Sequence, residues 1–120
     1  MQKIFITWGS GFIGSQLLNL IVKKNKNLQI HAIFNKNIIN VKSTNKFHKY
    51  KIDLRKKKDF LKNLNKINPH LIINLAGFKN PKKNELNKKK SYEENFIINK
   101  NVTDYCKKNK KRLIFTSTDL

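Results

Sequence analysis

Residues 3–15 decide the fold of this chain: Lys3-Ile4-Phe5-Ile6-Thr7-Trp8-Gly9-Ser10-Gly11-Phe12-Ile13-Gly14-Ser15. A short apolar run leads into the segment Gly9–Gly14, and a helix-like sequence follows it. Glycines permit a tight turn and let the backbone approach a phosphate, and a helix N-terminus presents N–H groups and the positive end of its dipole. The stretch therefore predicts a strand, a turn and a helix that hold the pyrophosphate of a dinucleotide.

Trp8 is the residue of the turn that disturbs this pattern. A residue other than glycine is restricted in φ at a tight turn, and an indole here would crowd the phosphates or the adenosine. The spacing Gly9-x-Gly11-x-x-Gly14 still satisfies the general dinucleotide pattern one position later. We expect dinucleotide binding to be weakened or lost, and to be restored by Trp8→Gly.

The composition predicts one small domain with a strong positive charge. The chain has 120 residues, of which 27 are Lys or Arg and 7 are Asp or Glu, for a formal net charge of +20. The lysines are scattered through every segment among many asparagines, which favours a bias in composition over a dedicated site for polyanions. A basic module that binds nucleic acid stays open as an alternative, with the candidate aromatic residues Phe34, Phe47, Tyr50 and Phe78.

The cysteine and histidine pattern predicts neither a disulfide nor a metal site. Cys106 is the only cysteine, and no Cys/His cluster has the spacing of metal ligands. His31, His48 and His70 lie far apart in the sequence, and we expect each at the surface or at a strand edge. The uncharged run 4–22 is broken by glycines and polar residues, so we predict a cytoplasmic protein rather than a membrane anchor or a signal sequence.

Apolar runs that alternate with helical periodicity predict an α/β fold. We expect helices where apolar residues recur at helical spacing, and strands where they are continuous or alternate. The predicted strands are 3–7, 28–34, 47–54, 71–76 and 112–117, the predicted helices are 12–24, 57–67 and 92–108, and the predicted loops are 35–45 and 79–90. Ser91 is expected to cap the last helix. Strands that alternate with helices imply βαβ units, right-handed crossovers and a parallel sheet.

Four motifs, in a fixed order, carry a resemblance to a known family. The first is the glycine loop 7–14, which compares with Thr-Gly-x-x-Gly-x-x-Gly, and the second is Asp53-Leu54 at the end of the third strand. The third is Asn68-Pro-His-Leu-Ile-Ile-Asn-Leu-Ala-Gly77. The fourth is Asn95-Phe-Ile-Ile-Asn-Lys-Asn-Val102, followed by Arg112-Leu-Ile-Phe-Thr-Ser-Thr-Asp-Leu120. In these motifs the chain resembles the extended short-chain dehydrogenase/reductase family, also called the NAD-dependent epimerase/dehydratase family. The resemblance spans nearly the whole chain.

This resemblance implies a Rossmann-like three-layer fold, with a parallel sheet of about five strands in the order 3-2-1-4-5. Residues 1–120 would form a single NAD(P)-binding Rossmann domain, equivalent to the N-terminal part of the family's fold. The domain is expected to be incomplete at its C-terminus, because the family's last strands and substrate-binding lobe have no counterpart here. The strand 112–117 would then be an unpaired sheet edge, so we expect poor solubility or dimerisation.

The resemblance also assigns residues to the cofactor. The candidate residues are Gly9, Ser10, Gly11, Phe12, Ile13, Gly14, Asn35, Lys36, Asp53, Leu54, Leu75, Ala76 and Gly77. Gly11 would let the backbone meet the pyrophosphate, and Gly14 would allow close packing of helix on strand. Asp53 would accept the adenine amino group with Leu54 against the ring; alternatively, Asp53 caps the next helix. The segment 75–77 would lie beside the cofactor ribose, or would simply be a buried strand end.

The end of the second strand bears on the choice of cofactor. Proteins of this class that bind NAD place Asp or Glu there, to bond the ribose 2′-hydroxyl. The strand here ends Ile33-Phe34-Asn35-Lys36-Asn37, with no acid nearby. Since Lys36 is placed to meet a 2′-phosphate, NADP(H) is slightly favoured over NAD(H).

The catalytic residues that the resemblance identifies are an incomplete set. Thr118 corresponds to the Ser/Thr that bonds the reacting oxygen of the substrate, and Asn95 to an asparagine that supports the helix near the active site. The family's Tyr-x-x-x-Lys pair has no match, since neither Tyr92 nor Tyr105 is followed by a lysine four positions later. We therefore expect the NAD(P)-binding part of a nucleotide-sugar epimerase, dehydratase or reductase that is not catalytically complete as this chain.

The last residues of the chain indicate a branch of the family and a class of substrate. Ser117-Thr-Asp-Leu120 is similar to the dTDP-4-dehydrorhamnose reductase branch of the family, which makes nucleotide sugars the expected class of substrate. Besides the nucleic-acid module, a remnant of such an enzyme without function stays open as an alternative.

Overall fold

The computed structural model of the chain describes residues 1–24, 27–75 and 86–116. At its centre lies a sheet of five parallel strands in the order β3-β2-β1-β4-β5. The strands are β1 (Gln2–Thr7), β2 (Leu28–Phe34), β3 (Phe47–Lys51), β4 (Leu71–Asn74) and β5 (Arg112–Phe115). The helices are α1 (Phe12–Lys24), α2 (Lys57–Ile67), α4 (Lys88–Tyr92) and α5 (Ile98–Asn109), with a π-helical segment, η1 (Glu93–Ile97), between the last two. The predicted Rossmann-like architecture and its strand order are confirmed.

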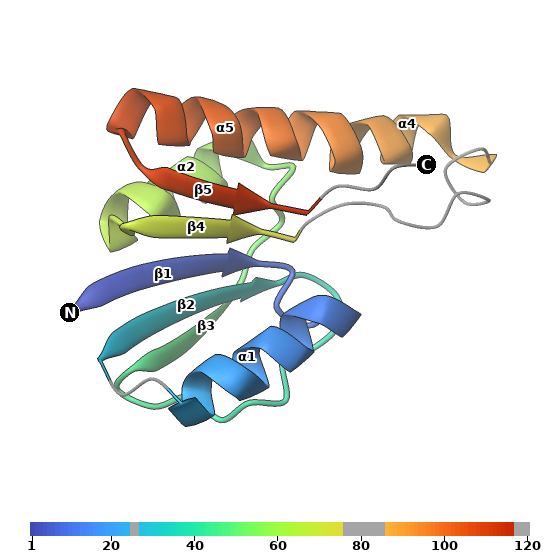
Figure 1. Cartoon of the computed structure of the whole chain (residues 1–120). Helices are drawn as coiled ribbons and strands as arrows, with labels where there is room; N and C mark the ends of the chain where they lie inside the picture. Colours follow the sequence, from blue (N-terminus) through green and yellow to red (C-terminus); the bar gives the residue numbers. More distant parts are fainter. Residues whose placement is uncertain (25–26, 76–85, 117–120) are drawn as a thin grey trace.

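Helices cover both faces of the sheet, which makes the fold a three-layer structure (Figure 1). Ile6 of β1 packs with Leu18 of α1 on one face. Phe5 packs with Phe60 of α2 on the other face, where the two ring centroids lie 6.3 Å apart. Residues 4–7 of β1 are all buried. A central strand covered on both faces needs continuous apolar sequence, which explains why this run shows no alternation.

β3 is shorter than predicted, because a turn follows it. The strand ends at Lys51 rather than at Leu54. Asp53 Oδ1 accepts a hydrogen bond from the backbone N–H of Arg55 at 3.0 Å, which is a turn that aspartate favours. Asp53 does not cap α2, whose N-cap position is Lys56 and has no side-chain hydrogen bond.

The last helical stretch starts earlier than predicted. It begins at Lys88, inside the predicted loop 79–90, and Asn87 caps it by accepting a hydrogen bond from the backbone N–H of Lys90 at 3.1 Å. Ser91 lies inside the helix and is not its cap. Asparagine and serine are similarly good N-caps, so an Asn-rich segment does not reveal which residue is used.

His31 is buried, which contradicts its expected place at the surface. Its ring stacks on those of His48 and Tyr50, with ring centroids 5.1 Å and 5.7 Å apart. Tyr50 Oη lies 2.8 Å from Nδ1, and Gln29 Oε1 lies 3.0 Å from Nε2. Burial, followed by the nearby His48 and Lys3, lowers the pKa of His31 to about 4. The position of β2 between two other strands, which the His spacing does not reveal, accounts for this burial.

The folded state should therefore lose stability as the pH falls. The pKa of His31 is about 4 in the folded chain and near 6.5 in the unfolded chain, so the unfolded state binds more protons in this window. Stability that is present above pH ~6.5 is lost on acidification, by about 2 kcal/mol at pH ~5. Urea unfolding at both pH values measures this loss. His31→Gln should flatten the pH dependence, and an equally steep curve for that variant would contradict the assignment.

β5 forms an edge of the sheet, with exposed apolar side chains. It pairs with β4 and lies last in the strand order. Ile114 is 54% exposed and Phe115 is 60% exposed. Both strands are shorter than predicted, since β4 ends at Asn74 and β5 at Phe115. The predicted ends of these two strands, Ala76 and Ser117, lie outside the described residues.

We propose that two copies of the chain associate through β5. Each copy has a formal net charge of +20, so repulsion opposes association and added salt should raise the dimer fraction. Light scattering after size-exclusion chromatography, at about 0.1 M and about 1 M salt, measures this fraction. Ile114→Lys should keep the chain monomeric, whereas Leu20→Lys, at an exposed position of α1, should not. A wild-type monomer at both salt concentrations would contradict this proposal.

Candidate functional site

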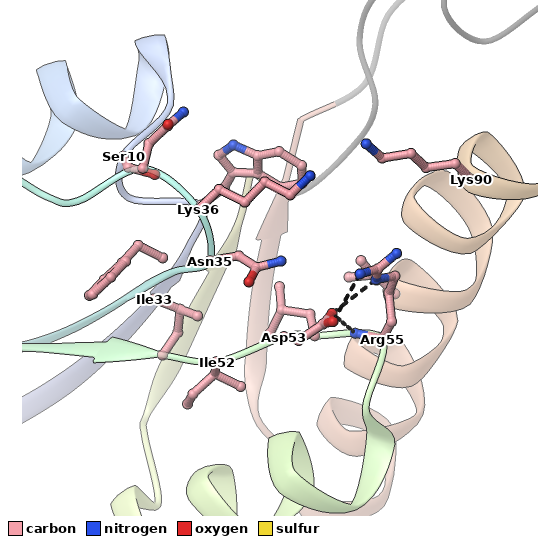
Figure 2. Close-up of a pocket in the computed structure, with 13 residues that line it drawn as sticks. Ser10, Ile33, Asn35, Lys36, Ile52, Asp53, Arg55 and Lys90 are labelled. Atoms are coloured by element: carbon pink, nitrogen blue, oxygen red, sulfur yellow. Dashed lines mark hydrogen bonds and ion pairs between the residues drawn. The ribbon is translucent and has the colours of Figure 1, made fainter. Parts of the chain in front are cut away.

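The carboxyl ends of β2 and β3 form one wall of a cavity of about 290 Å³ (Figure 2). Parallel α/β sheets bind their ligands at this edge, outside the carboxyl ends of the strands. Lys90 of α4 and Ile98 of α5 contribute to the lining as well. The lining residues are Trp8, Ser10, Ile33, Phe34, Asn35, Lys36, Asn37, Ile52, Asp53, Leu54, Arg55, Lys90 and Ile98.

Several residues predicted for the cofactor line this cavity: Ser10, Asn35, Lys36, Asp53 and Leu54. The first comes from the glycine loop, the next two follow β2, and the last two follow β3. The fold therefore brings together three segments that are distant in the sequence, at the edge where their strands end.

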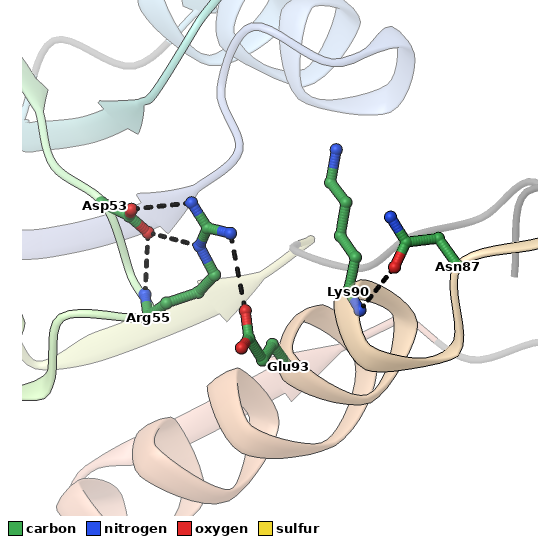
Figure 3. A network of polar contacts seen from close by, with 5 residues as sticks. All are labelled: Asp53, Arg55, Asn87, Lys90 and Glu93. Carbon is green, nitrogen blue, oxygen red and sulfur yellow. Dashed lines mark hydrogen bonds and ion pairs between the residues drawn. The ribbon is translucent and has the colours of Figure 1, made fainter.

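Arg55 holds the Asp53 carboxylate at this edge (Figure 3). Its Nε donates to Oδ1 at 3.0 Å and a terminal nitrogen donates to Oδ2 at 2.9 Å, so the pair is bidentate. The other terminal nitrogen lies 3.5 Å from Glu93 of η1. The side-chain hydrogen bonds from Arg55 hold the pKa of the Asp53 carboxyl below its ordinary value. Asp53 is therefore a fixed anion, and Arg55 links the end of β3 to the helix opposite.

The Asp53 carboxylate keeps capacity for a ligand. An ionised carboxylate offers about four lone-pair sites and only accepts hydrogen bonds. The backbone N–H and Nε of Arg55 bind Oδ1, and one guanidinium nitrogen binds Oδ2. Oδ2 can therefore accept one further hydrogen bond, such as that of an adenine amino group.

Lys36 and Lys90 add positive charge at the rim of the cavity. Lys36 follows β2 and is exposed, and Lys90 belongs to α4 and is half-buried. Figure 2 shows their amino groups at the upper rim, one from each side. Among the residues that line the cavity, the cations are Lys36, Arg55 and Lys90, and Asp53 is the acid. The cavity therefore suits a ligand that carries negative charge.

The glycines of the loop lie against the protein rather than in the cavity. The N–H of Gly9 donates to the carbonyl of Ile33 at 2.9 Å, and a Cβ on Gly9 would lie 2.9 Å from Leu18 Cδ1. A Cβ on Gly14 would lie 2.3 Å from the carbonyl oxygen of Trp8. Only glycine at position 14 lets α1 begin this close to the turn.

The remaining predicted residues of the loop and of β4 lie away from the cavity or outside the described residues. Phe12 and Ile13 begin α1, and both side chains are exposed. Leu75 is buried in the cluster beneath α1, which is the alternative role considered for it. The described residues do not include Ala76, Gly77 or Thr118.

Asn95 lies in η1 and contributes to a second cavity, of about 340 Å³, between α5 and the end of β5. Its Nδ2 donates to Ser91 Oγ at 3.1 Å, and its carbonyl accepts a hydrogen bond from Asn99 at 2.6 Å. A π-helical turn is a frequent feature of functional sites. The structure thus gives Asn95 contacts within its own helix, consistent with a supporting role.

A buried chain of hydrogen bonds joins β1, β4 and α5. Thr7 Oγ1 donates to Asn74 Oδ1 at 2.6 Å and accepts from the backbone N–H of Leu75 at 2.9 Å. Asn74 Nδ2 donates in turn to the side chain of Asn99 in α5. Thr7 and Asn74 are fully buried, so the network fixes the carboxyl ends of both central strands next to the cavity edge.

Sequence reasoning missed Arg55 and Lys90 as lining residues, and missed the network around Asn74. Of the 27 Lys and Arg residues, 25 are lysines, so Lys90 does not stand out by its type, whereas Arg55 is one of two arginines. Arg55 carried the better signal, because it follows Asp53 by two positions, within reach of an aspartate turn. The π-helical turn that brings Glu93 to Arg55 has no comparable pattern in the sequence.

Together, the strand order, the glycine turn before α1 and the cavity at the carboxyl ends of β2 and β3 define a Rossmann-like α/β protein. Residues 4–120 match the model of the NAD dependent epimerase/dehydratase family. The chain belongs to this family, as its four motifs predicted.

A relative and two solved structures illustrate this membership. The bifunctional polymyxin resistance protein ArnA of Wigglesworthia glossinidia brevipalpis is 35% identical over 98% of this chain and 18% of the relative. The dTDP-glucose 4,6-dehydratase of Bacillus anthracis, a complex with NAD, is 18% identical with a TM-score of 0.82, over 99% of this chain and 38% of the dehydratase. A hypothetical dTDP-4-dehydrorhamnose reductase of Sulfolobus tokodaii is 25% identical with a TM-score of 0.82, over 99% of this chain and 40% of that protein.

The chain therefore spans less than half the length of the relatives it matches. Within the described ranges, the structure contains no helix that is long and apolar enough to cross a membrane.

The network around Asn74 should contribute measurably to stability. Asn74→Leu removes the acceptor of Thr7 and the donor to Asn99 inside the protein, which costs about 1–3 kcal/mol. Urea unfolding measures the change. Asn65→Leu, at an exposed position of α2, is the matched control and should change stability by less than about 0.5 kcal/mol. Equal effects of the two substitutions would contradict a special role for Asn74.

Proposed function

We propose that this chain is the NAD(P)-binding part of a cytoplasmic nucleotide-sugar epimerase, dehydratase or reductase. The observation that carries the proposal is the convergence of the glycine loop, the end of β2 and the Asp53 turn on one cavity. The NAD complex of the Bacillus anthracis dehydratase, which shares the fold, supports it.

The cavity offers a contact for each part of an adenosine nucleotide. The adenine would lie against Leu54, with its amino group bonded to Asp53 Oδ2. The ribose and its phosphate would lie toward Asn35 and Lys36, at the end of β2. The pyrophosphate would approach the turn at Ser10, next to the start of α1.

The charges around the cavity favour NADP(H) over NAD(H). In the segment 33–37, which ends β2, no side chain is acidic, so the usual partner of a ribose 2′-hydroxyl is absent there. Lys36 is exposed at this end of the cavity and Lys90 adds a positive charge at its rim, whereas the charge of Arg55 is paired with Asp53 and Glu93. A 2′-phosphate would add negative charge where these cations lie.

The described residues fit cofactor binding rather than proton transfer to a substrate. When bound, NAD(P) would supply the hydride acceptor or donor. Tyr105 is buried and donates its hydroxyl hydrogen bond to the carbonyl of Leu64 at 3.3 Å. Tyr92 stacks on Phe96 at the surface, with ring centroids 5.1 Å apart. Neither tyrosine lines the cavity, and Thr118 remains our proposed contact for the reacting oxygen of a nucleotide sugar.

Three of the aromatic residues considered for nucleic-acid binding lie among the described residues, and these three do not form a stacking surface; the fourth, Phe78, lies outside the described residues. Phe47 is 1% exposed and belongs to the core beneath α1. Tyr50 lies within hydrogen-bonding distance of His31 and packs against the other core, and Phe34 lines the cavity. Single-stranded nucleic acid needs exposed aromatic faces along a basic groove, so we do not favour this alternative.

Titration calorimetry with NADP+ and NAD+ tests the proposal, in the Trp8→Gly background that is expected to open the loop. Trp8→Gly should bind NADP+ more tightly than NAD+. Adding Lys36→Ala should weaken NADP+ binding about tenfold to a hundredfold, the worth of a charge-assisted contact to phosphate, and leave NAD+ binding unchanged. Lys23→Ala, in the last turn of α1, is the matched control. If Trp8→Gly binds neither cofactor, the proposed function is wrong.

A further inference from the structure

Trp8 adopts a backbone conformation that tryptophan rarely adopts. Its φ is +54°, in the left-handed region. The other described residues with positive φ, apart from glycine, are Asn68 and Lys110, and each of these ends a helix in the usual left-handed cap. Trp8 has no such role, since it precedes a helix. The conformation costs about 1–2 kcal/mol, so the surrounding structure must hold it in place.

The indole occupies a definite position over the glycine loop. It packs against the hydrophobic clusters of both sheet faces, and it lines the cavity. A Cβ built on Gly11 would lie 2.9 Å from Cδ1 of Trp8 and 3.5 Å from Nε1. The indole therefore lies where the Cβ of any residue other than glycine would stand at position 11. The N–H of Gly11 also donates to the carbonyl of Trp8 at 3.1 Å, which closes the turn.

This position conflicts with a bound pyrophosphate. The second glycine of such a loop serves to let the backbone come close to the pyrophosphate. In this chain the open side of that glycine, Gly11, is filled by the five-membered ring of the indole. A pyrophosphate and the indole cannot both occupy this space, so a dinucleotide binds only after the side chain of Trp8 moves away.

The adenosine end of the site stays open. The cavity of about 290 Å³ lies at the small end of the ~300–1,000 Å³ range of ligand pockets. It contains Asp53 and Leu54 for an adenine, with Lys36 and Lys90 at its rim for phosphate groups. The described residues thus line a cavity that has room for one nucleoside.

We propose that Trp8 gates this site, so that the wild-type chain takes an adenine mononucleotide in preference to a dinucleotide. The ligand class is an adenosine that carries phosphate at the 2′ position of its ribose, with its base at Asp53 and its phosphate at Lys36. The inference rests on the proposed function, because it concerns the same cavity, and it adds the ligand that the unaltered loop selects.

Competing titrations with adenosine 2′-monophosphate and NADP+ test the gate, since the monophosphate carries the base, ribose and 2′-phosphate of NADP+ without its pyrophosphate. The wild-type chain should bind the monophosphate at least about tenfold more tightly than NADP+. Trp8→Gly should reverse or abolish this preference, because it should tighten NADP+ binding more than it changes the affinity for the monophosphate. Trp8→Asn provides a second open variant, because asparagine tolerates a positive φ and lacks the indole.

Trp8→Phe is the matched control, since it keeps an aromatic ring and the same backbone demand. It should keep the preference for the monophosphate. Trp8 is also the only tryptophan of the chain, so its fluorescence reports the gate directly. NADP+ should shift its emission to longer wavelength as the indole leaves its apolar contacts, whereas the monophosphate should shift the emission less.

The outcomes separate the two proposals. If the wild-type chain binds NADP+ as tightly as adenosine 2′-monophosphate, or if both open variants keep the wild-type ratio, the gate is refuted while the cofactor site stands. If wild-type chain and open variants bind neither ligand, the proposed function fails and the gate fails with it. Circular dichroism of each variant confirms that it is folded before it is titrated.

Discussion

The start of α1 is packed so closely against the end of β1 that no side chain fits between them, and the site depends on this contact. A Cβ on Gly14 would lie 2.3 Å from the carbonyl oxygen of Trp8 and 2.9 Å from the Cα of Gly9. The contact determines where α1 begins, and α1 then covers one face of the sheet through Leu18. It also restricts the turn between strand and helix, where Trp8 takes its positive φ. The position of the indole over Gly11 follows from the same close packing.

The sequence predicted best the elements whose apolar residues follow one regular spacing from end to end. The bounds of α1, β2 and α2 match the structure. The apolar residues of α1 and α2 recur with the helical period and face one core each, and those of β2 lie on both faces of the covered sheet. The ends of β3 and β4 differ, because a side chain competes with the ladder there. Asp53 makes a turn after β3, and Thr7 Oγ1 accepts the hydrogen bond of the Leu75 backbone N–H directly after β4. A strand boundary set by one polar side chain is invisible to hydrophobic periodicity.

The candidate site also combines residues that the sequence predicted with residues that it did not. The glycine spacing and the Asp53-Leu54 pair place the site, because backbone geometry and strand ends constrain those residue types. Arg55 and Lys90 reach the cavity only through the path of the chain, in particular through the π-helical turn that sets Glu93 opposite Arg55. The burial of His31 has a similar origin, since the strand order places β2 between β1 and β3. Contacts made by topology rather than by local sequence are the ones that the sequence did not reveal.

Trp8 connects the stability of the fold to the choice of ligand. A fully buried tryptophan removes about 150–250 Å² from water, which at about 25 cal/mol per Å² corresponds to about 4–6 kcal/mol. Trp8 is partly buried, so its packing contributes less than this, while its left-handed backbone costs about 1–2 kcal/mol. In the structure the indole packs against both hydrophobic clusters. A dinucleotide must displace the indole from these contacts before its pyrophosphate reaches Gly11, whereas an adenosine without a 5′-phosphate has no group at that position.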